Sequence, residues 1–290
     1  MTSPLPHDQI AANLSAHGYF ADETLVTALY LALELGKPLL LEGAPGVGKT
    51  QVGKTLAAML GRTVIRLQCY EGIDASKALY DWDHARQLLQ VRVAERSGTV
   101  AASDLYAPEF LIEMPLLKAL RNASTTVLII DEIDRADDAF EAFLLEFLSD
   151  HQISIPEIGT VTASEPVITI LTSNRTRELH DALRRRCLYH WIDYPDAARE
   201  RAIIEHHAPG ITRQAAQTLV DAVSGVRVLP LIKKPGVAES IDWARAAMAL
   251  ERGGASWPDA LKRSLGLLVK DREDIATIHN APVLRGTGEP

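Results

Sequence analysis

The residues that point most clearly to chemistry form the stretch Gly43–Thr50, GAPGVGKT. It fits the pattern G-x-x-x-x-G-K-[ST], in which glycines let backbone N–H groups curl around phosphate oxygens. A short apolar run over residues 37–43 precedes it and a helical pattern over 49–60 follows, which is the context that the motif requires. The helix N-terminus adds partial positive charge there. We expect Lys49 to reach the β- and γ-phosphates of a nucleotide and Thr50 to bind Mg²⁺ through its hydroxyl.

Two neighbouring acids, Asp131 and Glu132, follow the apolar run VLII. An apolar run without alternation suits a parallel strand that is covered on both faces. A carboxylate at the end of such a strand lies beside the phosphate loop in this architecture. We expect Asp131 to hold Mg²⁺ directly or through water, and Glu132 to orient and deprotonate the attacking water. The acids that follow, Asp134, Asp137 and Asp138, are expected to be a solvated helix start.

Asn174 and a run of arginines complete the candidate groups. Asn174 ends a third apolar run, VITILTSN, and its amide can hydrogen-bond the attacking water or the γ-phosphate. Ten residues further lie Arg184, Arg185 and Arg186. On an acidic protein, three adjacent arginines are usually a solvated face. The alternative is an arginine finger that reaches the γ-phosphate of a neighbouring subunit, and spacing alone does not say which arginine would do so.

The elements that must position these groups alternate between strands and helices up to about residue 195, and only helical patterns follow. Strands are expected over 37–43, 64–69, 126–132 and 167–174, helices over 22–36, 49–60, 115–121 and 137–150, and a hairpin over about 151–166. This order predicts an α/β domain over 1–195 and a small α-helical domain over 196–290. Residues 70–108 are mixed and predict no clear element.

Composition limits the classes of protein to consider. The chain has 290 residues, 47% of them apolar and 23% charged, which is the mix of a globular protein with a real core. Its 30 basic and 38 acidic residues give a net charge of −8, which argues against a generic nucleic-acid binder. Cys69 and Cys187 match neither a disulfide framework nor a zinc spacing. Neither a signal peptide nor a membrane-spanning run is recognisable, so we expect a cytoplasmic protein without membrane insertion.

The order of these motifs resembles that of the AAA+ ATPases, and longer strings resemble the MoxR branch and, within it, the CoxD-like proteins. The strings that carry the closer resemblance are LEGAPGVGKT (41–50), RLQCYEGID (66–74), ALYDWDHARQLL (78–89), LIIDEIDRAD (128–137), LTSNRTRELHDALRRRCLYHWIDYP (171–195) and KPGVAESIDWARA (234–246). The resemblance spans roughly residues 15–280.

This resemblance implies a P-loop AAA+ core, with a parallel sheet between helices, and a helical lid. It implies a homo-oligomeric ring, usually a hexamer, with ATP and Mg²⁺ at the subunit interfaces. Thr50 and Asp131 would hold the metal, Glu132 would be catalytic and Asn174 would be sensor 1. The residues that would bind the nucleotide are Gly43, Ala44, Pro45, Gly46, Val47, Gly48, Lys49, Thr50 and Gln51.

Three further implications concern the finger, the insertions and the lid. Alignment favours Arg186 as the finger, with Arg185 next. Residues 151–166 match an extra hairpin before sensor 1, and residues 70–110 match an insertion in helix 2 that faces the ring centre. The aromatic residues of this insertion are either substrate contacts or packed core: Tyr70, Tyr80 and Trp82.

One position departs from the MoxR pattern. Ala238 stands where MoxR proteins usually place the sensor 2 arginine at the start of a lid helix. Lys233 or Lys234 would supply the positive charge instead, or the sensor is missing. Coupling of the nucleotide to the lid is therefore in question.

The resemblance also implies partners. MoxR-like proteins typically act with a protein that carries a von Willebrand factor A domain, as chaperones that insert metals or activate enzymes. CoxD-like members resemble maturation factors for molybdenum hydroxylases such as carbon monoxide dehydrogenase. The implied function is therefore ATP-driven remodelling or maturation of a client enzyme.

Three other functions stay open. A nucleic-acid-remodelling AAA+ motor has the same motifs, but the charge of −8 opposes it. A small-molecule kinase would use the P-loop, but the Asp-Glu pair favours water as the acceptor. A scaffold that binds ATP without turnover is opposed by the intact Lys49 and Glu132.

Overall fold

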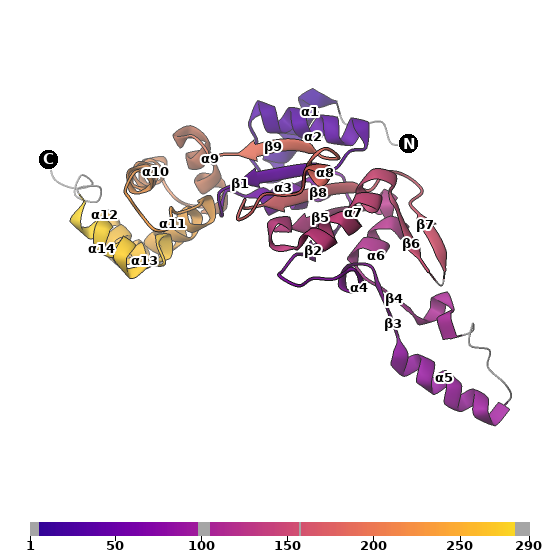
Figure 1. Cartoon of the computed structure of the whole chain (residues 1–290). Coiled ribbons are helices and arrows are strands. Elements are labelled where there is room, and N and C mark those ends of the chain that lie inside the picture. The colour runs from indigo at the N-terminus through magenta and orange to yellow at the C-terminus, as the bar shows by residue number, and fades with distance from the viewer. Residues whose placement is uncertain (1–5, 98–104, 157, 282–290) are drawn as a thin grey trace. The chain divides into compact units, whose positions relative to one another are not determined.

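A five-stranded parallel sheet is the centre of the fold (Figure 1). The computed structural model describes residues 6–97, 105–156 and 158–281, without the side chains of 75–76 and 94–97. The strands lie in the order β2-β5-β8-β1-β9. Their bounds are β1 Leu39–Gly43, β2 Thr63–Gln68, β5 Thr126–Asp131, β8 Ile168–Ser173 and β9 Leu188–Ile192. The α/β fold class predicted from the sequence is confirmed.

The register of the sheet brings the carboxyl ends of its strands to one edge. Gln68 on β2 pairs with Asp131 on β5, and Glu42 on β1 pairs with Ser173 on β8. Residues 127–130 of β5 pair with residues 168–171 of β8. Parallel strands all end at the same edge, so the polar residues that follow each apolar run lie close together there.

Helices cover both faces of the sheet. Alternate residues of a strand point to opposite faces. Leu128 and Ile130 of β5 belong to the core cluster that includes α6 (Pro115–Arg121) and α7 (Asp138–Asp150). On the other face, a Cβ at Gly53 of α3 (Lys49–Met59) would lie 2.8 Å from Ile129 Cδ1. This close approach explains a glycine inside the helix.

Smaller elements surround the sheet. The pairs β3–β4 and β6–β7 are each antiparallel, and β6–β7 lies within the hairpin expected over 151–166, of which residue 157 is outside the described residues. Their bounds and those of the neighbouring helices are α1 His7–Ala16, α2 Glu23–Leu35, α4 Ala75–Ala78, β3 Tyr80–Trp82, α5 His84–Ser97, β4 Leu111–Glu113, β6 Gln152–Ile155, β7 Gly159–Thr162 and α8 Asp181–Arg184.

The segment expected to be an insertion, 70–110, contains α4, β3 and α5, and its residues 98–104 lie outside the described residues. Tyr80 packs against the core of the sheet domain. Trp82 contacts the rings of Tyr80 and Tyr106 edge-on, with centroids 6.0 and 5.2 Å away. Tyr70 is exposed. Tyr80 is therefore partly buried against the core, whereas Tyr70 is open to solvent.

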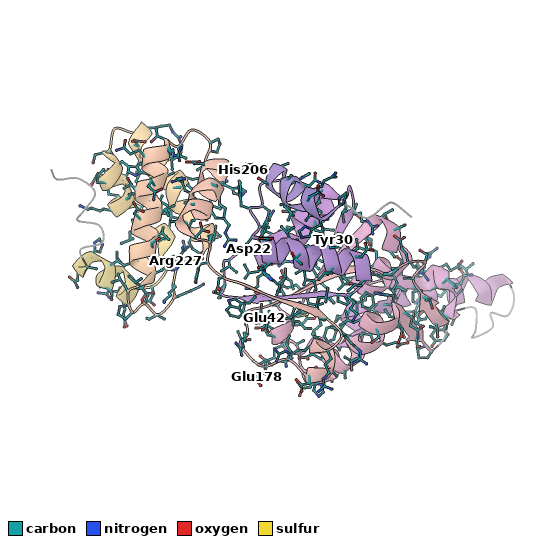
Figure 2. All side chains as sticks on the ribbon, turned by 90° about the horizontal axis from the view of Figure 1, so that it is seen from above. Asp22, Tyr30, Glu42, Glu178, His206 and Arg227 are labelled. Atoms are coloured by element: carbon teal, nitrogen blue, oxygen red, sulfur yellow. The ribbon has the colours of Figure 1, made fainter. Side chains whose placement is uncertain are left out.

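The C-terminal helices have a core of their own. Trp243 is fully buried there and donates its indole N–H to the Leu261 carbonyl at 3.1 Å. Arg227, labelled in Figure 2, forms a two-pronged ion pair with the buried Glu200, at 2.6 and 2.8 Å. The helices are α9 Ala197–His207, α10 Arg213–Arg227, α11 Val237–Arg252, α12 Trp257–Arg263, α13 Leu265–Leu268 and α14 Arg272–Asn280.

The chain forms two compact units. One holds the described residues up to Ile10, Glu23–Glu42 and Thr50–Trp191. The other holds Ala11–Asp22, Gly43–Lys49 and the residues from Ile192 on. The expected division at residue 195 stays a prediction. Over the described ranges, none of the helices combines the length and the apolarity needed to cross a membrane.

Candidate functional site

The loop Gly43–Lys49 wraps around the side chain of its own lysine. Lys49 Nζ donates to the carbonyl oxygens of Gly43 and Ala44, both at 2.8 Å, and the residue is only 7% exposed. Gly46 and Gly48 have φ angles of 80° and 96°, which L side chains rarely adopt. The glycines therefore allow a curled loop that keeps an ammonium group near its backbone.

Two other segments of the same unit contact this loop. The Val237 N–H at the start of α11 donates to the Gly46 carbonyl at 2.9 Å. A Cβ at Gly236 would lie 2.7 Å from Gly46 Cα, so a side chain at Gly236 would push the two segments apart. Tyr19 lies beside Gly48, and burial raises the pKa of its phenol well above the usual value. The contact of Tyr19 was not predicted, because no spacing rule links this residue to the loop.

Asp131 is the most connected carboxylate of the sheet edge, and its side chain is only 3% exposed. Thr50 Oγ1 donates to Asp131 Oδ1 at 2.8 Å, so the two groups expected to hold the metal do lie together. Thr172 Oγ1 donates to the same oxygen. Arg66 donates to Oδ2 through Nε, at 2.9 Å, and through Nη2. Neither Thr172 nor Arg66 was predicted from the sequence.

Glu132 follows in a left-handed conformation, with φ 55° and ψ 49°. Its backbone N–H donates to Thr172 Oγ1 at 3.0 Å. Its carboxylate oxygen Oε2 accepts from Gln68 Nε2 at 3.0 Å and lies 3.6 Å from Arg135 Nη1. The side chain is partly exposed. A fixed, partly exposed carboxylate next to Asp131 can orient a water molecule and accept a proton from it.

Asp134 is buried, and the expectation that it is solvated is wrong. It is 3% exposed, and its carboxylate accepts from the backbone N–H of Asn174 at 3.2 Å and of Thr176 at 2.9 Å. Thr176 Oγ1 donates to it at 2.7 Å. Burial acts to raise the pKa of Asp134, but these hydrogen bonds outweigh it and the pKa is lowered. By contrast, Asp137 caps α7 by accepting from the Phe140 N–H.

Asn174 lies at the end of β8, where the sequence places it. Asp134 holds its backbone. Within the described part of the chain its amide side chain makes no hydrogen bond with protein groups. The amide is therefore available to a water molecule or a phosphate oxygen.

The three arginines differ in their surroundings. Arg186 donates through Nε to Ser149 Oγ and through Nη1 to the Ala182 carbonyl at 2.9 Å. The Arg184 guanidinium lies 6.0 Å from the centroid of the Tyr189 ring. Arg185 is exposed and, over the described ranges, its guanidinium has no hydrogen bond or ion pair. Arg186 must therefore release Ser149 and Ala182 to act on another subunit, whereas Arg185 need not.

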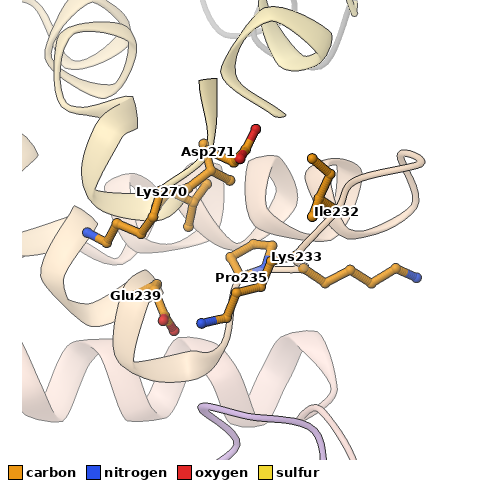
Figure 3. Close-up of a pocket in the computed structure, with 9 residues that line it drawn as sticks. Ile232, Lys233, Pro235, Glu239, Lys270 and Asp271 are labelled. Carbon is orange, nitrogen blue, oxygen red and sulfur yellow. The ribbon is translucent and has the colours of Figure 1, made fainter. Parts of the chain in front are cut away.

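The start of α11 shows what stands at the sensor 2 position. Ala238 is the second residue of the helix and is exposed. Lys233 and Lys234 line a pocket of about 230 Å³ together with Pro235 and Glu239 (Figure 3). In Figure 3 the Lys233 side chain points away from Glu239. The structure therefore puts cationic groups near the start of this helix, whereas its first turn, residues 237–240, contains no arginine.

The donor set at Asp131 fits Mg²⁺. Hydroxyl and carboxylate oxygens are hard ligands, and Mg²⁺ is usually bound through one or two carboxylates, substrate phosphates and water. Among the described residues, no group of three or more His, Cys, Asp and Glu side chains could form a dedicated metal cage. Thr50 and Asp131 thus match a cation that arrives with a phosphorylated ligand.

Comparison with known proteins decides the family. Residues 38–187 match the family model "AAA domain (dynein-related subfamily)". The chain belongs to this family. It is an AAA+ ATPase, and AAA+ ATPases in general use a nucleotide with Mg²⁺ and commonly oligomerise.

Individual relatives are distant. An uncharacterized protein of Staphylococcus saprophyticus is 24% identical over 182 residues, covering 60% of this chain and 62% of that protein, which is less than two thirds of its length. NorQ of Paracoccus denitrificans is 26% identical over 215 residues, covering 72% of this chain and 70% of NorQ. The RuvB Holliday junction branch migration motor of Thermotoga maritima superposes with a TM-score of 0.52 at 20% identity, covering 88% of this chain and 71% of that chain. This last likeness shows the fold alone.

We predict that Asp134→Asn destabilises the protein by about 2 kcal/mol at pH 7, because hydrogen bonds to a buried charge are lost. A lowered pKa in the folded protein contributes stability above the unfolded value of about 3.9. That stability disappears as the pH falls through the lowered pKa. The difference between variant and parent should therefore shrink between about pH 5 and pH 3 in urea unfolding. Asp138→Asn, at an exposed position, is the matched control. If Asp134→Asn lowered the free energy of unfolding equally at about pH 5 and about pH 3, the role of the charge would be contradicted.

Proposed function

We propose that this chain is a MoxR-type, CoxD-like AAA+ ATPase that hydrolyses ATP to remodel or mature a client enzyme. The observation that carries the MoxR assignment is the similarity to NorQ, a MoxR-family protein, over 72% of this chain. The strings around the nucleotide motifs support the same branch. The hydrogen bond between Thr50 and Asp131 supports the hydrolytic chemistry.

The phosphate loop would bind the nucleotide through the backbone N–H groups of Gly43–Lys49, with Gln51 one residue beyond Thr50. Lys49 now donates to two loop carbonyls and would transfer these hydrogen bonds to the β- and γ-phosphates. Thr50 and Asp131 would hold Mg²⁺, which when bound neutralises charge on the phosphate oxygens.

Three residues would act on the attacking water or on the γ-phosphate. Glu132 would orient it and accept its proton, since Gln68 and Thr172 fix this residue at both side chain and backbone. Asn174 would donate an amide hydrogen to the water or to the γ-phosphate. An arginine from the next copy would stabilise the negative charge of the transition state.

The proposed biological role involves other copies of the chain, a partner protein and a client. The partners would be other copies of this chain in a ring, usually a hexamer, a von Willebrand factor A domain protein and a client enzyme such as a molybdenum hydroxylase. The lid over 196–290 would move as the ATP and ADP forms of each site alternate. The insertion over 70–110, with the exposed Tyr70, is the segment that we assign to the client.

Two variants should distinguish ATP hydrolysis from ATP binding. We expect Glu132→Gln to keep ATP binding and to lower phosphate release by about 10²-fold or more, because the general base is lost. Lys49→Ala should abolish binding of a fluorescent ATP analogue. Lys54→Ala, on the exposed face of the same helix, is the control and should bind normally. Parent-like hydrolysis by Glu132→Gln would show that another group is the base.

The finger should act on the neighbouring subunit. We expect Arg186→Ala to lose about 10³-fold in turnover with nucleotide binding unchanged. Mixing Arg186→Ala with Glu132→Gln chains should restore part of the activity, since mixed interfaces combine one intact Glu132 with one intact finger. Arg184→Ala is the control. Rescue in mixtures with Arg185→Ala, and none with Arg186→Ala, would assign the finger to Arg185.

Assembly should depend on the nucleotide. We expect the Glu132→Gln variant with ATP and Mg²⁺ to have six times the mass of the 31.7 kDa chain by light scattering. In low salt, where non-specific DNA binding is strongest, it should not retard a DNA duplex in a gel. A monomer with ATP would contradict the ring, and DNA-stimulated turnover would favour a nucleic-acid motor.

A further inference from the structure

We infer that Arg66 is the counter-ion of Asp131 and makes Mg²⁺ binding at this carboxylate depend on a bound nucleotide. This inference rests on the proposed roles of Thr50 and Asp131. It adds a residue that neither the phosphate-loop motif nor the Asp-Glu pair contains.

Each of the two carboxylate oxygens of Asp131 has its own set of donors. The hydroxyls of Thr50 and Thr172 donate to Oδ1. Two nitrogens of the Arg66 guanidinium donate to Oδ2. With the side chain 3% exposed, water contributes little to the solvation of this charge. The guanidinium is therefore the group that compensates the buried carboxylate.

Arg66 lies on β2, an edge strand of the sheet, and its side chain is 48% exposed. Its Nη2 also donates to Gln68 Oε1 at 2.5 Å, and Gln68 Nε2 donates to Glu132. The guanidinium can therefore turn toward solvent without leaving a cavity in the core. Through Gln68 it is also connected to Glu132, the side chain proposed as the base.

The positive charge of Arg66 opposes a second cation at Asp131. A Mg²⁺ ion that arrives alone would gain one carboxylate and would face the positive guanidinium. Mg²⁺ gives up its water reluctantly and usually takes phosphate oxygens along with carboxylates. A nucleotide would bring several negative charges that offset the repulsion between the two cations. Arg66 therefore weakens binding of the metal alone much more than binding of the metal with nucleotide.

The test measures the binding of Mn²⁺, a stand-in for Mg²⁺, to the full chain without nucleotide. The electron paramagnetic resonance signal of free Mn²⁺ reports how much metal stays unbound. A unit charge within a few ångströms shifts such equilibria by about tenfold or more. We expect Arg66→Gln to bind Mn²⁺ at least about tenfold more tightly than the parent. With ADP present, the difference should fall below about threefold, because the phosphates screen the guanidinium charge. Equal affinities without ADP, or an undiminished difference with ADP, would overturn the inference.

Three controls define the outcome. Arg66→Lys keeps the charge and should behave like the parent, even if Arg66→Gln is less stable. Arg62→Gln, at the entry to β2, removes a guanidinium bound to the Ala123 carbonyl and Glu165, and should change nothing. Asp131→Asn combined with Arg66→Gln should abolish the gain, and a gain that persists would place the Mn²⁺ elsewhere and overturn the inference.

Failure of the proposed function would have a different signature. ADP binding is measured in parallel with a chelator and no metal, for the parent and Lys49→Ala. If the parent and Lys49→Ala bind ADP equally well, the proposed nucleotide site is wrong, independently of the Mn²⁺ affinities. If Lys49 matters and Arg66→Gln does not alter Mn²⁺ binding, the nucleotide site stands and the role of Arg66 is wrong.

Discussion

A buried carboxylate must be compensated, and the sheet edge is organised around the one on Asp131. Removing such a charge from water costs several kcal/mol unless opposite charge and hydrogen bonds replace the lost solvation. Thr50, Thr172 and Arg66 come from α3, β8 and β2, so three elements that are distant in sequence meet at one side chain. The constraint fixes the start of α3 against the end of β5.

The parallel pairing of the strands also places the other polar groups of the proposed site next to Asp131. The register that places Gln68 opposite Asp131 also places Gln68 within reach of Glu132. Asp134, three residues after Asp131, accepts hydrogen bonds from the backbone N–H groups of Asn174 and Thr176, just after β8. The groups proposed to bind metal, activate water and sense phosphate are thus tied to each other by hydrogen bonds at 2.8–3.2 Å.

The sequence predicts well what depends on local pattern and poorly what depends on partners from other strands. The curled loop that comes after β1, the strand β5 and the helix α7 follow from glycine spacing, an apolar run and a helical period, and the structure has these three elements, with Gly46 and Gly48 at positive φ in the loop. The edge strand β9 was not predicted, because apolar or aromatic residues fill nearly every position of LYHWI, so no alternation of polar and apolar residues marks it in the sequence. Asp134 was expected in solvent because its donors, Asn174 and Thr176, lie some forty residues away.

Arg66 and Gln68 are also residues whose partners on another strand could not be read from the sequence. In the sequence they are two polar residues that alternate with Ile65 and Leu67, which is the pattern of a strand with one solvated face. Only the pairing of β2 with β5 turns that face toward the two acids. Arg66 is bound to Asp131 and Gln68 to Glu132, and the two side chains are bound to each other. A change at Asp131, the carboxylate proposed to bind the metal, therefore has a direct path, through two side chains on one strand, to the carboxylate proposed to activate water.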